Sequence, residues 1–270
     1  MIRNSNVKHT IVTFSPDIFL ALLRAKLVNF RASFINKAIN ICVWAGCVVF
    51  VMGYVMQAFG LAQDYGVFQL AGIFAVVGLF ELYGNTAGLV ADLDGDRTLV
   101  YYLTLPTSMF TVLASYVCYY VIISTSMCFA VLPFGKLLLW NKFNFAAVSW
   151  SKFLVFVLLV NTTWSILAFI LTAHFVSIDK LSTIWVRVIF PLWFLGGFQS
   201  SWNKIFSVVP KFAYVMLLNP VTYATEGMRA AMLGQDGFLP FWLCVLAMLG
   251  ILIGASVWAL KAMKIRLDLV

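Results

Sequence analysis

Apolar runs long enough to cross a lipid bilayer dominate this sequence. A membrane-spanning helix needs about 20 predominantly apolar residues, and runs of that kind recur between residues 38 and 262. Hydrophobic residues make up 63% of the chain and charged residues only 10%, which excludes a soluble globular domain. We therefore predict an all-α integral membrane protein.

The apolar runs predict six transmembrane helices. No Gly/Ser-rich or Pro-rich linker and no internal repeat separates them, so residues 1–270 are predicted to form a single transmembrane domain. An even number of spans places both termini on the same side of the membrane. The predicted spans are residues 38–58, 68–91, 109–134, 153–176, 183–199 and 238–262.

The N-terminal segment, residues 1–37, carries six Lys or Arg side chains and a single acid, Asp17. Apolar residues recur in it at spacings of three or four, which is typical of an amphipathic helix. Two interpretations stay open, a helix lying in the membrane interface and a cytoplasmic extension of the first span. Both place the N-terminus in the cytoplasm, and the segment lacks the features of a cleaved signal peptide.

The distribution of cations supports this topology. With both termini inside, the cytoplasmic segments hold 12 of the 18 Lys and Arg residues and the outer segments hold 6. The loop at 135–152 is predicted to lie outside although it carries three lysines. The net charge of +8 reflects orientation in the membrane and indicates no nucleic-acid partner.

Motifs for catalysis, nucleotide binding and metal binding are missing from the sequence. It has no GxxxxGK[ST] phosphate loop, no HExxH and no GxSxG, and its only histidines are His9 and His174. We expect no catalytic residue, metal site or cofactor on this chain, and any ATP must bind another subunit. The cysteines all lie in apolar runs and are predicted to be small core residues: Cys42, Cys47, Cys118, Cys128 and Cys244.

The second predicted span carries a polar stripe, whose members follow one another at spacings of 3, 4, 3 and 4 and so share one helix face. Such a face should look into protein or a water-filled cavity, away from lipid. A bare carboxylate at mid-membrane is costly, so Glu81 is predicted either to pair with Arg187 or His174 or to act directly in transport. The stripe consists of Gly78, Glu81, Asn85, Gly88 and Asp92.

A charged, amphipathic segment follows at residues 92–108. Its acids and one Arg precede a short apolar turn that ends at Pro106, which suits a cytoplasmic helix lying on the membrane surface and offered to a partner. An ordinary cytoplasmic loop is the alternative. The residues predicted to serve this contact are Asp94, Asp96, Arg97, Leu99, Tyr102 and Leu103.

Residues 200–237 are too polar to cross the membrane, and we predict two short re-entrant helices that dip into the outer leaflet under a cover of protein. The second helix has clear boundaries. Asn219 is a favourable N-cap, Pro220 suits the first helical position and Gly234 suits the end. Glu226 and Arg229 lie three residues apart and can form an ion pair on one helix face.

Three motifs carry a family resemblance. The first runs from Asn219-Pro220 through Thr222, Tyr223, Glu226 and Arg229 to Gly234; the second is PLWFLGGF at 191–198; the third is Pro106-Thr107-Ser108, which closes the segment 92–108. Together they resemble the membrane subunit of type 2 ABC exporters, the class of polysaccharide, lipo-oligosaccharide and drug export permeases. The chain departs from that pattern with Gly196-Gly197 where Ser-Gly is usual and with Asp94-Gly95-Asp96 before Arg97.

This resemblance implies a homodimer or heterodimer of permeases in the bacterial inner membrane, joined to two cytoplasmic ABC ATPase subunits that bind ATP and Mg. The segment 92–108 would then be the coupling helix. The implied substrate is amphipathic, a lipid-linked saccharide, a lipid or a hydrophobic drug, exported by alternating access. Our candidates for the substrate path are Glu81, Asn85, Phe194 and Phe198, and for the outer gate Asn219, Pro220, Tyr223, Glu226 and Arg229.

Two other functions stay open at this stage. A membrane scaffold or accessory subunit would keep the six spans without transporting anything. A proton-coupled secondary transporter would use the carboxyl of Glu81 to carry protons.

Overall fold

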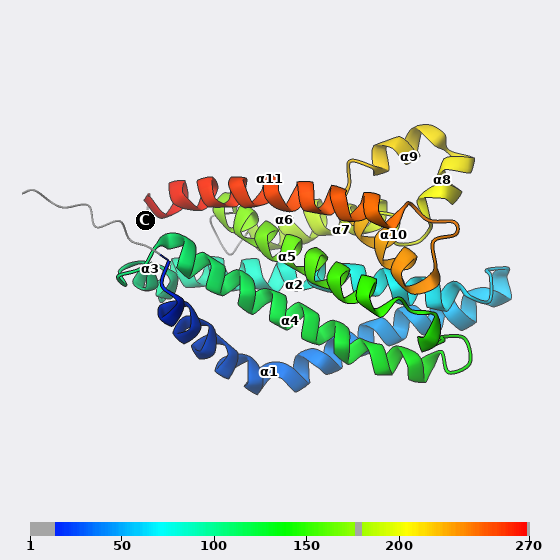
Figure 1. The fold of residues 1–270 in the computed structure, drawn as a ribbon, viewed down its shortest axis with the longest axis horizontal. Helices are drawn as coiled ribbons and strands as arrows, with labels where there is room; N and C mark the ends of the chain where they lie inside the picture. The colour runs from blue at the N-terminus through cyan, green and yellow to red at the C-terminus, as the bar shows by residue number, and fades with distance from the viewer. Residues whose placement is uncertain (1–13, 176–179, 269–270) are drawn as a thin grey trace, which may run out of the picture.

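A computed structural model describes residues 14–175 and 180–268, and every regular element within these residues is helical. Five helices are long and apolar enough to cross a membrane. They lie roughly side by side in an elongated bundle (Figure 1). Their bounds are α1 Pro16–Phe50, α2 Tyr65–Asp94, α4 Met109–Leu138, α5 Trp150–His174 and α11 Phe241–Asp268.

The first long helix, α1, is continuous from Pro16 to Phe50 and continues as a π-helical turn, Val51–Val55, and a 3-10 turn, Met56–Phe59. Residues 16–37 of the predicted N-terminal segment and the predicted first span are therefore parts of one helix, with no break near residue 37. The helix bends within its length (Figure 1). Gly60, with φ of 90°, ends it in a left-handed conformation that favours glycine.

The predicted fifth span is shorter and less regular than expected. It consists of α6 Leu181–Ile184, a π-helical turn Trp185–Ile189 and α7 Phe190–Leu195. Together these form an apolar helix, Leu181–Leu195, that is shorter than the long spans. The helix ends at Gly196, where only glycine fits because a Cβ would lie 2.4 Å from Cβ of Val221 and 2.5 Å from the carbonyl oxygen of Leu192.

The central helix of the bundle is α2. In its most apolar stretch of 18 residues, 78% of the residues are buried, whereas the corresponding share is 17% in the span that contains α1 and 28% in α11. It packs against α5, α10 and α4, and the indole Nε1 of Trp164 on α5 donates a hydrogen bond of 3.0 Å to the carbonyl of Ala75. The hydrophobic core therefore surrounds α2, and the other long helices keep one face outward.

Three short helices cluster at one end of the bundle, where two were predicted. They are α8 Trp202–Val208, α9 Pro210–Met216 and α10 Pro220–Leu233, and they lie opposite the short helix α3, Thr98–Leu103 (Figure 1). We call these two ends the α10 end and the α3 end. The bounds predicted for α10 are confirmed, since the Asn219 side chain accepts a hydrogen bond of 2.9 Å from the Val221 N–H and Gly234 follows the last turn.

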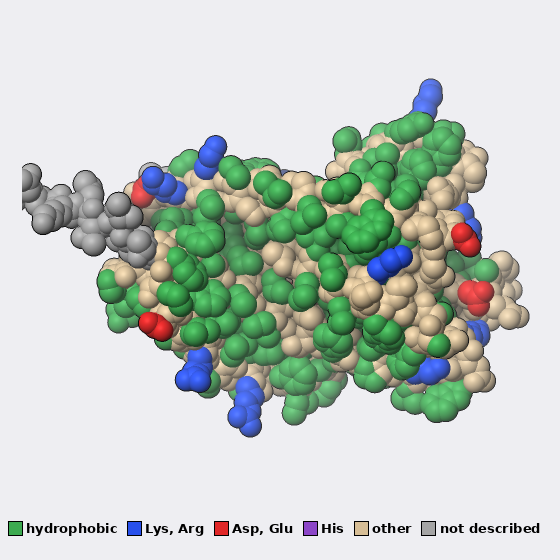
Figure 2. All heavy atoms as spheres, in the orientation of Figure 1, with side chains coloured by type: hydrophobic (Ala, Val, Ile, Leu, Met, Phe, Trp, Pro, Cys, Tyr) green, Lys and Arg blue, Asp and Glu red, His purple; other side chains and the backbone are tan. Residues whose placement is uncertain are grey.

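The surface has the pattern of a membrane protein. Hydrophobic side chains cover the middle of the face shown in Figure 2, and most of its charged side chains lie toward the two ends. Large apolar residues are widely exposed on the long helices, as for Ile35 at 67% and Leu246 at 70%. Such exposure fits contact with lipid tails, in which apolar surface is not penalised.

The cysteines are all free, as predicted, but they are not all in the core. Cys128 and Cys244 are buried, Cys42 and Cys118 are half-buried, and Cys47 is exposed on α1. Hydropathy alone gave no information about which face of a span each cysteine occupies.

Some predicted features fall outside the described residues. These are the cations Arg3 and Lys8, the histidine His9, and the predicted end of the fourth span at residue 176.

Close packing of α10 against α5 and α11 depends on Gly227. A Cβ there would lie 2.3 Å from Cζ of Phe156 and 2.9 Å from Cβ of Cys244. We expect Gly227→Ala to lower the thermal unfolding midpoint of the detergent-purified protein, because overpacking costs about 1–3 kcal/mol. Gly250→Ala on α11 is the matched control, since a Cβ there meets nothing within 4 Å. Equal midpoints for the two variants would contradict the packing described here.

Candidate functional site

The α10 end is organised by a fully buried ion pair. Glu226 and Arg229 are each 0% exposed, and Nη1 of Arg229 lies 3.5 Å from Oε1 of Glu226. Glu226 also accepts hydrogen bonds from the backbone N–H groups of Trp202, at 3.1 Å, and Leu239, at 3.0 Å. One carboxylate on α10 therefore holds the start of α8 and the connection that leads into α11.

Arg229 holds a different part of the chain. Its Nη1 and Nη2 donate hydrogen bonds of 2.8 Å to the carbonyls of Gly197 and Phe198, and its guanidinium lies 3.6 Å from the ring centre of Phe68. The loop after α7 is thus fixed against α10 and α2. We call Glu226, Arg229 and these backbone partners the Glu226–Arg229 clamp.

The remaining motif residues of α10 reinforce the clamp. The Asn219 side chain, which caps α10, also donates a hydrogen bond of 2.8 Å to the carbonyl of Leu192 on α7. Thr225 donates to the carbonyl of Gly196 at 3.1 Å, and Thr222 donates to that of Met216 at 2.7 Å. The motifs at 191–198 and 219–234 are therefore joined in space through side chain to backbone hydrogen bonds.

The electrostatics of the clamp balance burial against pairing. Burial raises the pKa of the Glu226 carboxyl, while the Arg229 charge and the N–H groups of Leu239 and Trp202 oppose that shift. Both side chains lie inside the protein, so they are not placed to contact a passing molecule. The other three predicted gate residues, Asn219, Pro220 and Tyr223, are half-buried.

Glu81 has a partner, but the predicted partner was wrong. Its Oε2 lies 2.6 Å from Nζ of Lys37 on α1. Arg187 and His174 were chosen by depth alone, and depth does not determine which side of α2 a neighbouring helix occupies. Arg187 is instead exposed within the π-helical turn, and the Nδ1 of His174 lies 2.7 Å from the carbonyl of Ile170 on its own helix.

The predicted path residues divide into three environments. Asn85 is 8% exposed and Phe198 is 0% exposed, so both lie within the protein. Phe198 packs against Trp193 and Trp44 and cannot line an open path in this conformation, which corrects the prediction for that residue. Phe194 is 49% exposed, and the Glu81 side chain is 16% exposed.

The short helix α3 is fixed to the end of α2 by Asp92. Its Oδ1 and Oδ2 each accept a hydrogen bond of 2.9 Å, from the N–H groups of Thr98 and Leu99. The intervening turn contains Arg97 in a left-handed conformation, with φ of 53°. Asp92 therefore satisfies two of the free N–H groups at the start of α3, a role that was not predicted from its places in the polar stripe and at the start of the segment 92–108.

The side chains of the segment 92–108 point in two directions. Leu99 is 0% exposed and belongs to the core, whereas Asp94, Asp96, Arg97 and Tyr101 are exposed. Tyr102 and Leu103 are half-buried. A partner that approaches α3 would therefore meet mainly the charged turn and Tyr101, and Leu99 would anchor the helix.

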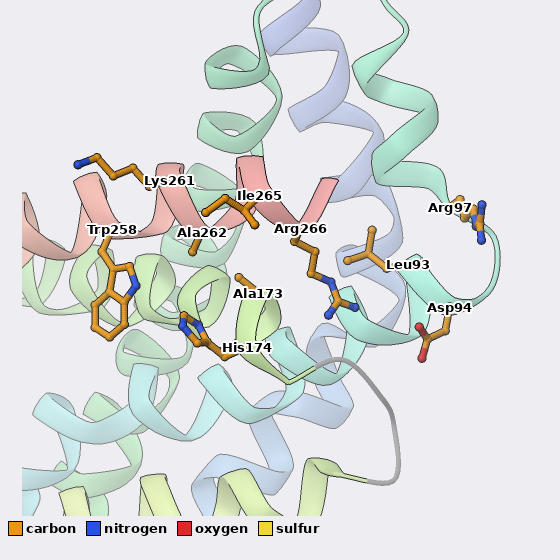
Figure 3. A pocket seen from close by; sticks show the side chains of 10 residues that line it. All are labelled: Leu93, Asp94, Arg97, Ala173, His174, Trp258, Lys261, Ala262, Ile265 and Arg266. Carbon is orange, nitrogen blue, oxygen red and sulfur yellow. The ribbon is translucent and has the colours of Figure 1, made fainter. Parts of the chain in front are cut away.

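A cavity of about 680 Å³ lies at the α3 end, between the C-terminal ends of α2, α5 and α11. In Figure 3, His174 lies beside Trp258 on one side of it, and Arg266 points toward Leu93 and Asp94. The two rings on that side meet edge to face, with centroids 5.6 Å apart. The cavity thus adjoins the charged turn that begins the predicted coupling segment.

Within the described residues, no group of three or more His, Cys, Asp or Glu side chains could hold a metal ion. The described residues offer three other features: the helix α3 held by Asp92 at one end, the Glu226–Arg229 clamp at the other, and the Glu81–Lys37 ion pair between them.

We expect Glu226→Ala to destabilise the protein by about 3 kcal/mol or more, because Arg229 would be left as an unpaired buried charge. Thermal unfolding in detergent, followed by size-exclusion chromatography, measures the loss. The control is Asp236→Asn, which removes an exposed carboxylate close to the end of α10. If both variants unfold at the wild-type temperature, the clamp does not support the fold as argued.

Comparison with known proteins agrees with this architecture. No curated protein matches the chain. The family model described as ABC-2 type transporter matches residues 18–233, from near the start of α1 through the end of α10. The chain therefore belongs to the ABC-2 type transporter family.

Proposed function

We propose that this chain is the membrane subunit of an ATP-driven exporter that moves an amphipathic substrate by alternating access, with α3 as the element that receives force from a cytoplasmic ATPase. Family membership supports the role of exporter permease. The observation that carries the coupling proposal is the fixed attachment of α3 to α2 through Asp92, combined with the exposed turn at 94–97. In this proposal the α3 end is cytoplasmic and the α10 end faces outward.

Further contacts would spread a displacement of α3 through the bundle. Nζ of Lys26 on α1 lies 4.8 Å from the ring centre of Tyr102 on α3 and 4.0 Å from that of Tyr116 on α4. It also lies within hydrogen-bond distance, 3.4 Å, of the Ser115 hydroxyl. A push on α3 would therefore reach α2 through Asp92 and α1 and α4 through Lys26.

The proposed path for the substrate runs along the polar stripe of α2. Gly88 on this stripe and Gly84, one turn before it, border open space, since a Cβ at either would meet nothing within 4 Å. The Glu81–Lys37 pair lies beside them, partly exposed. We propose that a second permease, identical or homologous, encloses this face and that the clamp shapes the outer gate without touching the substrate.

The two alternative functions receive less support. A scaffold has no need of a tethered surface helix with an exposed charged turn. A proton-coupled transporter would use the Glu81 carboxyl as its carrier, and in the structure this carboxyl is occupied by a contact of 2.6 Å with Nζ of Lys37. ATP and Mg would bind the partner ATPase.

The coupling proposal predicts that Arg97→Glu combined with Tyr101→Asp disrupts the ATPase interface, because both side chains are exposed on the segment offered to the partner. Loss of interface anchors of this kind costs about 2 kcal/mol or more, which is roughly a thirtyfold loss of affinity. Affinity purification of the tagged permease, with quantitative mass spectrometry of the co-purified ATPase, measures the effect.

The matched control combines Lys211→Glu with Tyr214→Asp on α9, where both residues are also exposed but lie at the opposite end. It should retain the ATPase. Undiminished co-purification with the α3 variant, or equal loss with both variants, would remove the coupling role of α3. A wild-type permease that is monodisperse but brings no ATPase would contradict the exporter proposal itself.

A further inference from the structure

A second polar stripe lies on α1. Asn29, Ser33, Asn36 and Asn40 follow one another at spacings of 4, 3 and 4, so they share one flank of the helix. All three asparagines are exposed, and Ser33 is half-buried. Among the described residues, no hydrogen bond involves the three amide side chains. We call these four residues the α1 amide stripe.

The neighbouring exposed flank of α1 is apolar. Ile35, Ile39 and Val43 are 67%, 55% and 59% exposed and follow one another at spacings of four. That flank suits lipid tails. The amide stripe does not, because unsatisfied polar groups in hydrocarbon are expensive. The helix therefore has one flank suited to lipid and another that requires water, a polar ligand or a protein partner.

The stripe adjoins the Glu81–Lys37 pair near the middle of the bundle. Lys37 is residue 22 of the 44 in the α1 span, and Glu81 is residue 17 of the 30 in α2. The Lys37 side chain is 35% exposed and that of Glu81 is 16% exposed, so the ammonium is the more accessible member. The open positions Gly84 and Gly88 of α2 extend the same region.

We propose that the α1 amide stripe and Lys37 form one wall of the aqueous substrate path and recognise a polar head group that carries an acidic substituent. The amides can donate to and accept from hydroxyl or carbonyl groups, and Lys37 supplies the positive charge for the acid. Glu81 positions the Lys37 ammonium between passages of substrate. This inference rests on the proposed export function and names the substrate class for the same path.

The row of amides favours a water-filled path over a water-free interface with a second copy of the chain. A dry interface must satisfy each buried polar group at a matching register, and here the polar positions extend over three turns of helix. Water or a hydroxyl-bearing head group can satisfy each position independently as it passes.

The first test compares water access to two neighbouring positions of α1, one on the amide stripe and one on the apolar flank. Asn40→Cys and Ile39→Cys are made in the full permease with its ATPase, reconstituted in lipid nanodiscs, and treated with a membrane-impermeant methanethiosulfonate. Peptide mass spectrometry reports modification at each cysteine, so the native cysteines can remain. The native Cys47, which is exposed and in register with Asn36 and Asn40, is an internal probe.

We expect Asn40→Cys to react at least about tenfold faster than Ile39→Cys, because the nucleophile that attacks the reagent and displaces methanesulfinate is the thiolate, which forms in water and not in lipid. Equally slow reaction at both positions would overturn the aqueous path and indicate a dry interface between copies. Equally fast reaction would also overturn it, since α1 would then have no lipid flank.

The second test measures the sign of the local potential. Reaction rates of Asn40→Cys are compared for an anionic and a cationic methanethiosulfonate, with and without Lys37→Met. We expect the ratio of the anionic to the cationic reaction rate to fall by about threefold or more when the Lys37 charge is removed. In Lys37→Arg, which keeps the charge, the ratio should stay at its wild-type value. Lys264→Gln, an exposed charge near the C-terminal end of α11, is the control and should leave the ratio unchanged.

An unchanged ratio in Lys37→Met would overturn the acidic-substituent assignment. Should that variant fail to fold, as judged by size-exclusion chromatography, Lys37→Gln provides the same comparison. Failure of the proposed export function would give a different result: the reagent would modify Asn40→Cys, but the permease would bind no ATPase.

Discussion

The structure of the α10 end depends on hydrogen bonds to backbone N–H and C=O groups that have no partner within a regular helix. The chain between α7 and α11 changes direction several times, and each change leaves N–H and C=O groups that are costly to bury without a hydrogen-bond partner. Glu226 accepts from two such N–H groups and Arg229 donates to two such carbonyls. The mutual attraction of the two charges offsets part of the cost of their burial, and the backbone partners supply the remaining hydrogen bonds. The compact arrangement of short helices at this end of the bundle follows from that single cluster.

The same constraint connects the two ends of the molecule through α2. At the α10 end, a Cβ on Gly72 would lie 3.2 Å from Nη2 of Arg229, so the helix approaches the clamp closely. At the other end, Asp92 caps α3. A helix that is mostly buried between these two points can translate or tilt only together with its neighbours. In the function proposed here, α2 transmits the movement of α3 to the outer gate and also provides part of the path wall.

Local signals in the sequence were sufficient for α10, because the N-cap, the proline, the closing glycine and the spacing of Glu226 and Arg229 all lie within one short segment. The backbone partners of the clamp come from distant segments, and no local pattern specifies them. Lys37 as the partner of Glu81 was missed because depth along a helix says nothing about which helix lies beside it. The interrupted fifth span was missed because hydropathy does not distinguish a π-helical turn from an α-helical one. The amides of α1 went unnoticed among the cations and apolar residues of the same segment.

The π-helical turns at Val51–Val55 and Trp185–Ile189 have a consequence for comparing this chain with its relatives. A π-helical turn commonly accommodates one additional residue in an α-helix and rotates every later position to a new azimuth. Two homologous sequences can therefore align without a gap and still present different side chains to the path beyond these turns. Chimeras designed to exchange specificity between permeases should place their junctions away from both turns, so that the helical phase on each side is inherited from a single parent.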